Sequence, residues 1–137
     1  MHKNIIHLLY NSHVMNRHEY RVKVVFALYQ SLLLNKDINK SFDDNFSDEE
    51  KVDYINVIEN DLILNKDNYI QEISSHLRKW TFDRLSYLEQ AILLVACSEI
   101  KKEVASKSIV IDEAIRIAKE YCDEKSYQYI NGVLDNL

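Results

Sequence analysis

The chain has 137 residues, of which 47% are hydrophobic and 28% charged, with a single glycine and no proline. This length suits one compact domain that buries a real core. Because tight hairpin turns need residues that tolerate positive φ, the scarcity of glycine and proline argues against a sandwich, a barrel or a multi-stranded sheet. The lone Gly132 also excludes the glycine-rich loops that cradle phosphates. We therefore expect an all-α protein.

The two cysteines, Cys97 and Cys122, lie among apolar residues, which predicts reduced thiols in the core and not a disulfide or a metal site. The longest apolar stretch, Ala91 to Cys97, is too short to span a bilayer. The N-terminus has no small-residue site of the kind that signal cleavage needs. We expect a soluble cytoplasmic protein.

The net charge of -5 is distributed unevenly along the chain. Residues 1–40 hold six Lys and Arg against two Asp and Glu, a net +4, whereas residues 41–75 hold two against ten, a net -8. A local basic end can bind phosphates even when the whole molecule is acidic. Four of the five histidines also fall in the first segment, but their irregular spacing predicts no metal site: His2, His7, His13 and His18. No cofactor is expected either.

The first half of the chain carries signals for three helices. Residues 1–15 hold a short apolar cluster and form an N-terminal extension, and apolar residues at helical spacing predict a helix from Asn16 to about Asn35. Residues 36–46 are polar and acidic. Residues 47–50, Ser-Asp-Glu-Glu, have the form of a capping box and predict a helix that runs to about Leu64. Residues 65–67 predict a break, and residues 68–80 a third helix.

The second half repeats the capping-box pattern at residues 86–89, which open a strongly apolar helix. Residues 104–108 predict a loop, and the next helix should end near Cys122. Ser126 is expected to cap a last helix. Gly132 lies inside that helix, where it costs about 1 kcal/mol relative to alanine, so we expect a close approach of backbone or ligand there. The total is six to seven helices.

Candidate catalytic groups are few. The acidic pairs Asp43/Asp44 and Glu49/Glu50 lie in polar segments that are typical of a solvated face, and neither cysteine has a local base, so no enzymatic activity is predicted. Tyrosine is abundant, with nine copies, and it suits half-buried positions at interfaces and stacking on unpaired bases. Tyr129 lies in the first turns of the last helix, close to an N-terminus that favours anions.

Residues 110–119, VIDEAIRIAK, are followed by DEKS at 123–126 and YINGVLD at 129–135. This run resembles the C-terminal signature of the NusB family, a V-A-I-N-E-A-I-x-L-A-K helix followed by an acidic turn and S-x-K-F-V-N-G-V-L-D. Residues 27–30, ALYQ, are similar to an element of the family's first helix, and residues 84–85 and 88–93 extend the match. The resemblance covers about residues 16–137.

The resemblance implies a helical fold of two packed subdomains, about residues 16–65 and 66–137. It also implies a non-catalytic role in which the protein binds a short single-stranded RNA beside a small-subunit ribosomal protein, NusE, and acts indirectly on transcribing RNA polymerase during ribosomal RNA synthesis. Two surfaces are nominated for RNA, the start of the first helix and the segment after the acidic turn: Arg17, His18, Arg21, Lys23, Lys125, Ser126, Gln128, Tyr129 and Asn131. The protein-partner surface would include Tyr29 and Glu89.

The sequence departs from the family at Glu19, which lies amid the basic residues, and at Gln128, where the family has lysine. Fewer phosphate contacts predict weaker binding and a shallower salt dependence. Two alternatives stay open: a protein-interaction bundle of the same fold with little RNA affinity, and a stand-alone relative of the RNA-binding domain of ribosomal RNA cytosine methyltransferases. A homodimer is also compatible with the pattern.

Overall fold

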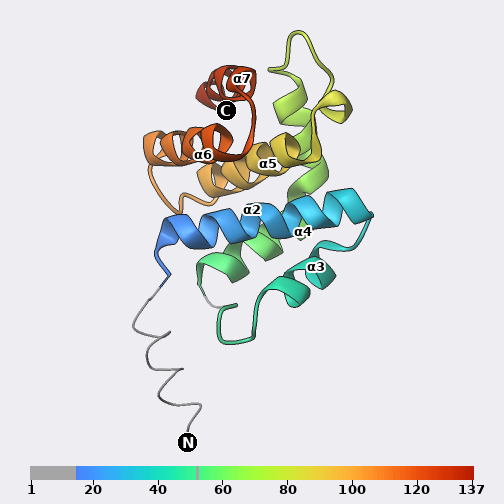
Figure 1. Ribbon diagram of the computed structural model, residues 1–137, viewed down its shortest axis with the longest axis vertical. Helices are drawn as coiled ribbons and strands as arrows, with labels where there is room; N and C mark the ends of the chain where they lie inside the picture. Colours follow the sequence, from blue (N-terminus) through green and yellow to red (C-terminus); the bar gives the residue numbers. More distant parts are fainter. Residues whose placement is uncertain (1–14, 52) are drawn as a thin grey trace, which may run out of the picture.

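The computed structural model describes residues 15–51 and 53–137, and in that part of the chain it contains six α-helices and a short 3₁₀ helix (Figure 1). In chain order they are α2 (Arg17–Leu34), α3 (Ile38–Asn45), α4 (Tyr54–Ser74), η1 (Phe82–Arg84), α5 (Tyr87–Lys101), α6 (Lys107–Tyr121) and α7 (Glu124–Asp135). No strand occurs among the described residues, and the predicted all-α class is confirmed. The N-terminal extension expected over residues 1–15 falls outside them except for Met15.

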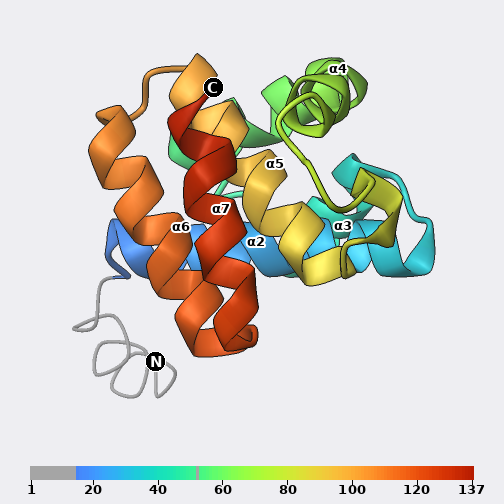
Figure 2. The ribbon, with the colours of Figure 1, turned by 90° about the horizontal axis from the view of Figure 1, so that it is seen from above.

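Helix α5 is the centre of the fold. Every residue from Gln90 to Glu99 is buried, and α5 contacts α2, α4, α6 and α7. Figure 2 shows α6 and α7 on one side of α5 and α4 on the other. A helix surrounded in this way must be apolar on most of its circumference, which explains the unbroken apolar run of its sequence. Cys97 is fully buried there, and burial raises the pKa of its thiol to about 12.

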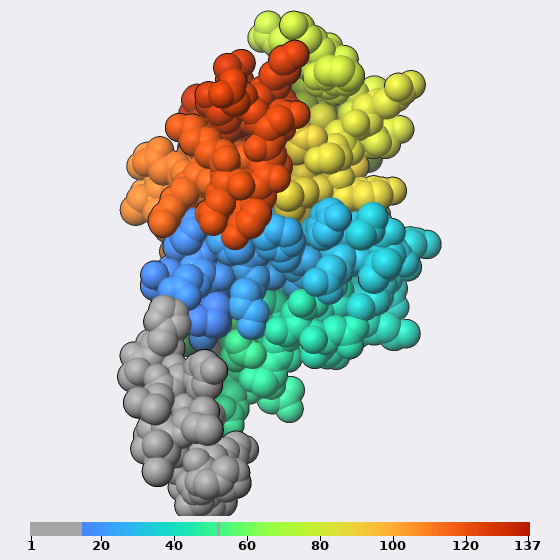
Figure 3. Space-filling view, in the orientation of Figure 1, coloured from blue at the N-terminus to red at the C-terminus, as the bar shows by residue number. Residues whose placement is uncertain are grey.

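Helix α2 lies between α5 and α3. It contacts α5 on one side and α3 on the other, and Figure 3 shows its residues as a band with α6 and α7 above and α3 below. Its buried stripe includes Val24, Val25 and Leu28. Residues from both halves of the sequence therefore share one core.

Side-chain caps set where the helices begin. Asn16 and Glu19 form a reciprocal capping box at the start of α2, and Ser86 and Glu89 form the predicted one at α5. At α7 the prediction is wrong, because Asp123 and not Ser126 is the cap: the Asp123 carboxylate accepts hydrogen bonds from the backbone N–H groups of residues 125 and 126. The negative charge of an aspartate at this position also interacts favourably with the positive end of the helix dipole.

Helix α4 is a single helix where the sequence predicted two. The expected break at residues 65–67 is helical, and the Asn65 side-chain amide donates to Asp61 one turn earlier, at 2.9 Å. The apolar face then continues through Tyr69 and Ile73, which are buried. The predicted boundary between subdomains near residue 65 therefore falls within a helix. The expected extension of this helix to Trp80 is wrong as well, since α4 ends at Ser74.

Two further differences concern the segment before α4. Ser47 and Glu50 do form capping contacts, but only a turn follows them, and α4 starts later, at Tyr54. Helix α3 lies where the sequence suggested only a polar segment. It is held by tertiary contacts, because Phe42 is fully buried and the Ser41 hydroxyl donates to the backbone carbonyl of Ala27 at 2.5 Å.

None of the described helices combines the length and the apolar character that a membrane-spanning segment requires.

Candidate nucleic-acid interface

Arg17 is the exposed basic residue at the start of α2. The capping box places it there: the Asn16 side chain accepts from the backbone N–H of Glu19 at 2.9 Å, which fixes the first turn. The guanidinium carbon of Arg17 lies 4.5 Å from the centroid of the Tyr54 ring. A guanidinium held over an aromatic face keeps its N–H donors at its edge, where they can bind a phosphate.

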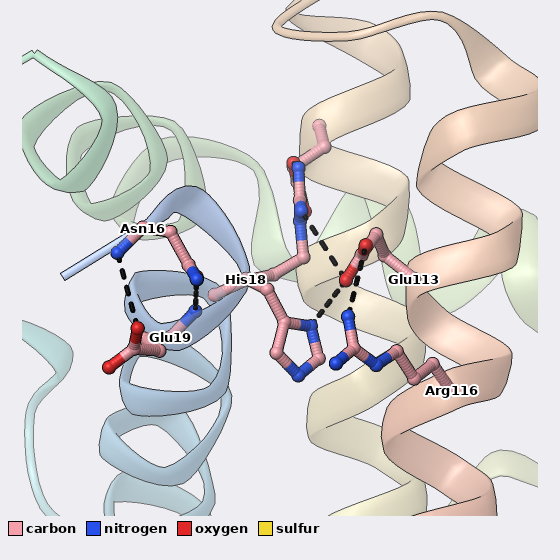
Figure 4. A network of polar contacts seen from close by, with 7 residues as sticks. Asn16, His18, Glu19, Glu113 and Arg116 are labelled. Atoms are coloured by element: carbon pink, nitrogen blue, oxygen red, sulfur yellow. Dashed lines mark hydrogen bonds and ion pairs between the residues drawn. The ribbon is translucent and has the colours of Figure 1, made fainter.

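His18 projects from α2 towards α6, where its Nδ1 pairs with the carboxylate of Glu113 (Figure 4). The same carboxylate lies 3.7 Å from an Arg21 nitrogen and 3.9 Å from an Arg116 nitrogen. One acid thus faces three basic groups. Its negative charge offsets part of the attraction that His18 would exert on a phosphate.

Arg21 is in the protein interior. Only 4% of it is exposed, and its guanidinium donates to both carboxylate oxygens of Glu99, at 2.7 Å from Nε to Oε2 and 2.7 Å from Nη2 to Oε1. Burial opposes its charge, but the hydrogen bonds and charge of Glu99 outweigh burial and raise the pKa of Arg21. The resemblance nominated this residue for RNA, and the structure instead places it against α5.

Lys23 faces a different neighbour. Its Nζ donates to Glu50 at 3.1 Å and lies 5.0 Å from the centroid of the Phe46 ring. It therefore points to the segment between α3 and α4. The basic residues of α2 do not form one continuous surface.

The other nominated surface is α7. Lys125, Gln128 and Asn131 are exposed along it, whereas Tyr129 is half-buried and Ser126 is buried. These exposed groups supply a cation and two side-chain amides, which can contact phosphates and base edges. Tyr129 packs partly against the core, and its hydroxyl points to α5.

The Glu89 carboxylate joins α5 to α7. It accepts hydrogen bonds from the Ser126 hydroxyl at 2.7 Å, the Tyr129 hydroxyl at 2.6 Å and the backbone N–H of Ser86 at 2.9 Å. Burial alone would raise the pKa of Glu89, but the hydrogen bonds, that of Tyr129 first, outweigh it and lower this pKa. Burial and the bond to Glu89 also raise the pKa of Tyr129 far above its ordinary value. Glu89, which was nominated for a protein partner, therefore contacts two residues nominated for RNA.

Tyr29, the second residue nominated for a protein partner, belongs to an aromatic cluster. Its ring lies 6.0 Å from that of Phe26 in an edge-to-face arrangement, and Phe26 lies 5.0 Å from Tyr121 of α6 in the same way. Tyr121 is 43% exposed. The cluster covers the junction of α2 and α6 beside the start of α7.

Within residues 15–51 and 53–137, no group of three or more His, Cys, Asp or Glu side chains is placed to hold a metal ion.

The comparisons with known proteins agree with this architecture. The family model described as NusB family matches residues 15–137. The chain belongs to the NusB family. The transcription antitermination protein NusB of Sulfurovum sp. (strain NBC37-1) is 38% identical over 124 residues, 87% of this chain and 95% of the relative. That of Clostridium botulinum (strain Alaska E43 / Type E3) is 37% identical over 131 residues, 90% of this chain and 98% of the relative.

Solved NusB structures share the fold. A T. maritima NusB structure superimposes with a TM-score of 0.80 at 28% identity and covers 90% of this chain and 91% of its own. A chain from a structure of the antitermination factors NusB and NusE with double-stranded RNA gives a TM-score of 0.74 at 23% identity, covering 89% of this chain and 96% of its own. At this identity the second likeness shows the fold alone.

In this NusB-family chain, two residues of the C-terminal signature make contacts within the protein. Glu113 of the signature pairs with His18, and Ser126 of the signature is buried against Glu89. The motif itself includes Glu113, but its partner is 95 residues away in the sequence, and no local pattern connects them. Sequence reasoning did not single out Glu99 or Phe26 either, because each contacts a residue that is far away in the sequence.

Proposed function

We propose that this protein is a non-catalytic, RNA-binding transcription antitermination factor of the cytoplasm, which binds a short single-stranded RNA together with NusE. Membership of the NusB family over residues 15–137 carries this proposal. Relatives that are 31–38% identical over most of their length bear the name transcription antitermination protein NusB. Through this RNA and NusE the protein would act indirectly on transcribing RNA polymerase.

The RNA contacts would come chiefly from α7 and from Arg17. Arg17 and Lys125 are exposed cations that suit phosphates. The Tyr129 ring would stack on a base, a contact worth about 1–3 kcal/mol, while the amides of Gln128 and Asn131 would reach base edges. His18 and Lys23 would add weaker contacts, since each already has an acidic neighbour, and Arg21 would support the surface from below.

Fluorescence anisotropy with a short antiterminator-type RNA tests the proposal, with and without NusE, at several salt concentrations. We expect binding that weakens with salt and strengthens with NusE. In the variant Lys125→Ala the slope of log affinity against log salt should fall by about one, as expected for one lost phosphate contact. Lys102→Ala, on the exposed end of α5, is the matched control. Absence of binding at low salt, in both the presence and the absence of NusE, would refute the proposal.

A second candidate is a protein-interaction bundle that has little RNA affinity. Its support is a surface groove of about 730 Å³ at the end of α4, whose lining includes Trp80 and Tyr87, 56% and 45% exposed. Exposed aromatic side chains of this size are typical of protein interfaces. Under this alternative, NusE binding would be the same with and without RNA, and Lys125→Ala would change nothing.

A further inference from the structure

Glu89 was nominated for the protein-partner surface, and it contacts two residues that were nominated for the RNA surface of α7. It lies in the first turn of α5, where its Oε1 accepts from the backbone N–H of Ser86. Its Oε2 accepts from two hydroxyls of α7, those of Ser126 and Tyr129. A carboxylate with three donors is held in one rotamer, and the two helices are tied together at their N-terminal ends.

The Tyr129 hydroxyl makes the shorter of the two contacts from α7, at 2.6 Å. Hydrogen bonds from a hydroxyl to an ionised carboxylate are short and roughly twice as strong as neutral ones. The ring is half-buried, so this bond fixes its remaining freedom. A phenylalanine would fill the same space, but its ring would be free of Glu89.

We propose that Glu89 is a positioning residue that holds the Tyr129 ring ready for base stacking and so couples the RNA surface of α7 to the protein-partner surface of α5. This inference rests on the proposed function. The physical reason is pre-organisation, because a ring that is already fixed loses less conformational entropy when it stacks on a base. The coupling is reciprocal, because a change on α7 also alters the carboxylate that the partner would meet.

The first test is RNA affinity in the absence of NusE. Tyr129→Phe keeps the ring and removes the bond to Glu89, and its affinity should fall about fivefold, the equivalent of one net hydrogen bond. Glu89→Gln should have a similar effect. The double variant should bind no worse than either single one, since both remove the same interaction. Tyr127→Phe is the matched control on the same helix, because the contact of its ring is with the Lys119 ammonium, which lies over it.

The second test is NusE affinity in the absence of RNA. Tyr129→Phe should weaken NusE binding at least about twofold, even though Tyr129 lies on the RNA surface, because the carboxylate loses a donor that orders it. A purely structural role would leave this affinity unchanged. Circular dichroism on each variant confirms that the helices are intact.

The outcomes separate the two proposals. If Tyr129→Phe binds RNA as tightly as the parent while Tyr129→Ala does not, the ring stacks without the help of Glu89, and the positioning role is refuted. If Tyr129→Phe leaves NusE affinity unchanged, the coupling is refuted. If the parent protein binds neither RNA nor NusE, the proposed function fails, and this inference fails with it.

Discussion

The buried ion pair between Arg21 and Glu99 should make Glu99→Gln strongly destabilising. The side chains are 5% and 1% exposed, and three nitrogen–oxygen contacts of 2.7 to 3.0 Å join them. The glutamine amide keeps one acceptor oxygen but removes the paired charge, so the buried guanidinium is left with only the more distant carboxylate of Glu113, 3.7 Å away, as a counter-charge.

Breaking a buried pair by removing one partner costs about 3–5 kcal/mol. We expect the lower end, about 3 kcal/mol, because one acceptor remains. This is a large share of the stability of a domain, which is about 5–15 kcal/mol in total. At about 4 °C per kcal/mol for a chain of this size, the Tm should fall by about 12 °C.

Urea unfolding followed by circular dichroism at 222 nm measures this change, with Glu103→Gln as a control in the exposed turn after α5. The free energy of unfolding of this control should lie within about 0.5 kcal/mol of that of the parent. The double variant Arg21→Met/Glu99→Leu should recover most of the stability, because apolar side chains of similar volume need no counter-charge. Equal midpoints for Glu99→Gln and Glu103→Gln would refute the reasoning and return Arg21 to the set of available phosphate contacts.

Three further predictions concern single positions. Because the pKa of Glu89 is lowered in the folded protein, its carboxylate contributes stability at pH values above the ordinary glutamate pKa of 4.5, and this contribution is lost as the pH falls through the folded pKa. The free energy of unfolding of the parent and of Glu89→Gln, measured at a series of acidic pH values, should therefore differ less once the pH is below the folded pKa. A difference that stays constant with pH would contradict the prediction. Gly132→Ala should stabilise α7 by about 0.5–1 kcal/mol, measured by thermal unfolding, since an added Cβ meets nothing within 4 Å; a loss of stability would show that the glycine is required. Ser86→Ala should lower the free energy of unfolding by about 1 kcal/mol, because it removes the cap of α5. Ser47→Ala should lower it by less, because the contacts of Ser47 precede only a turn. Equal losses of stability in urea unfolding would contradict this distinction.

One of the two reasons expected for Gly132 is wrong. The sequence suggested a close approach of backbone or ligand, but no backbone lies within 4 Å of a Cβ added at this position, and its φ is not positive. The approach of a ligand stays a prediction. The structure gives no account of why glycine stands there.

A local signal predicted the start of α5 well, because the box at Ser86 joins residues three apart and the sequence contains both partners. The Ser47 box is equally local and its contacts form, but no helix begins there, so a capping pattern alone does not determine a helix start. Prediction failed where distant contacts decide. Helix α3 depends on the contact of Ser41 with Ala27, fourteen residues away, and α4 continues through a polar stretch because its apolar face still has a core to cover.

The candidate site shows the same division. The family signature led to α7 and to the start of α2, but residue type could not show which side chains reach the surface. Arg21 and Ser126 are polar residues whose partners lie on α5, 78 and 37 residues away, and both are buried. Exposure therefore reduced the set of phosphate-binding candidates.

The scarcity of glycine and proline, the helical spacing and the C-terminal signature were sufficient, by themselves, to determine an all-α member of this family. These properties are local, or are repeated along one segment, so the chain order alone contains them. Only the tertiary structure decided which charges are free. It brings Glu99 and Glu113 against the basic residues of α2 and turns Glu89 towards α7, because the packing of helices around α5 joins residues that are far apart in the sequence.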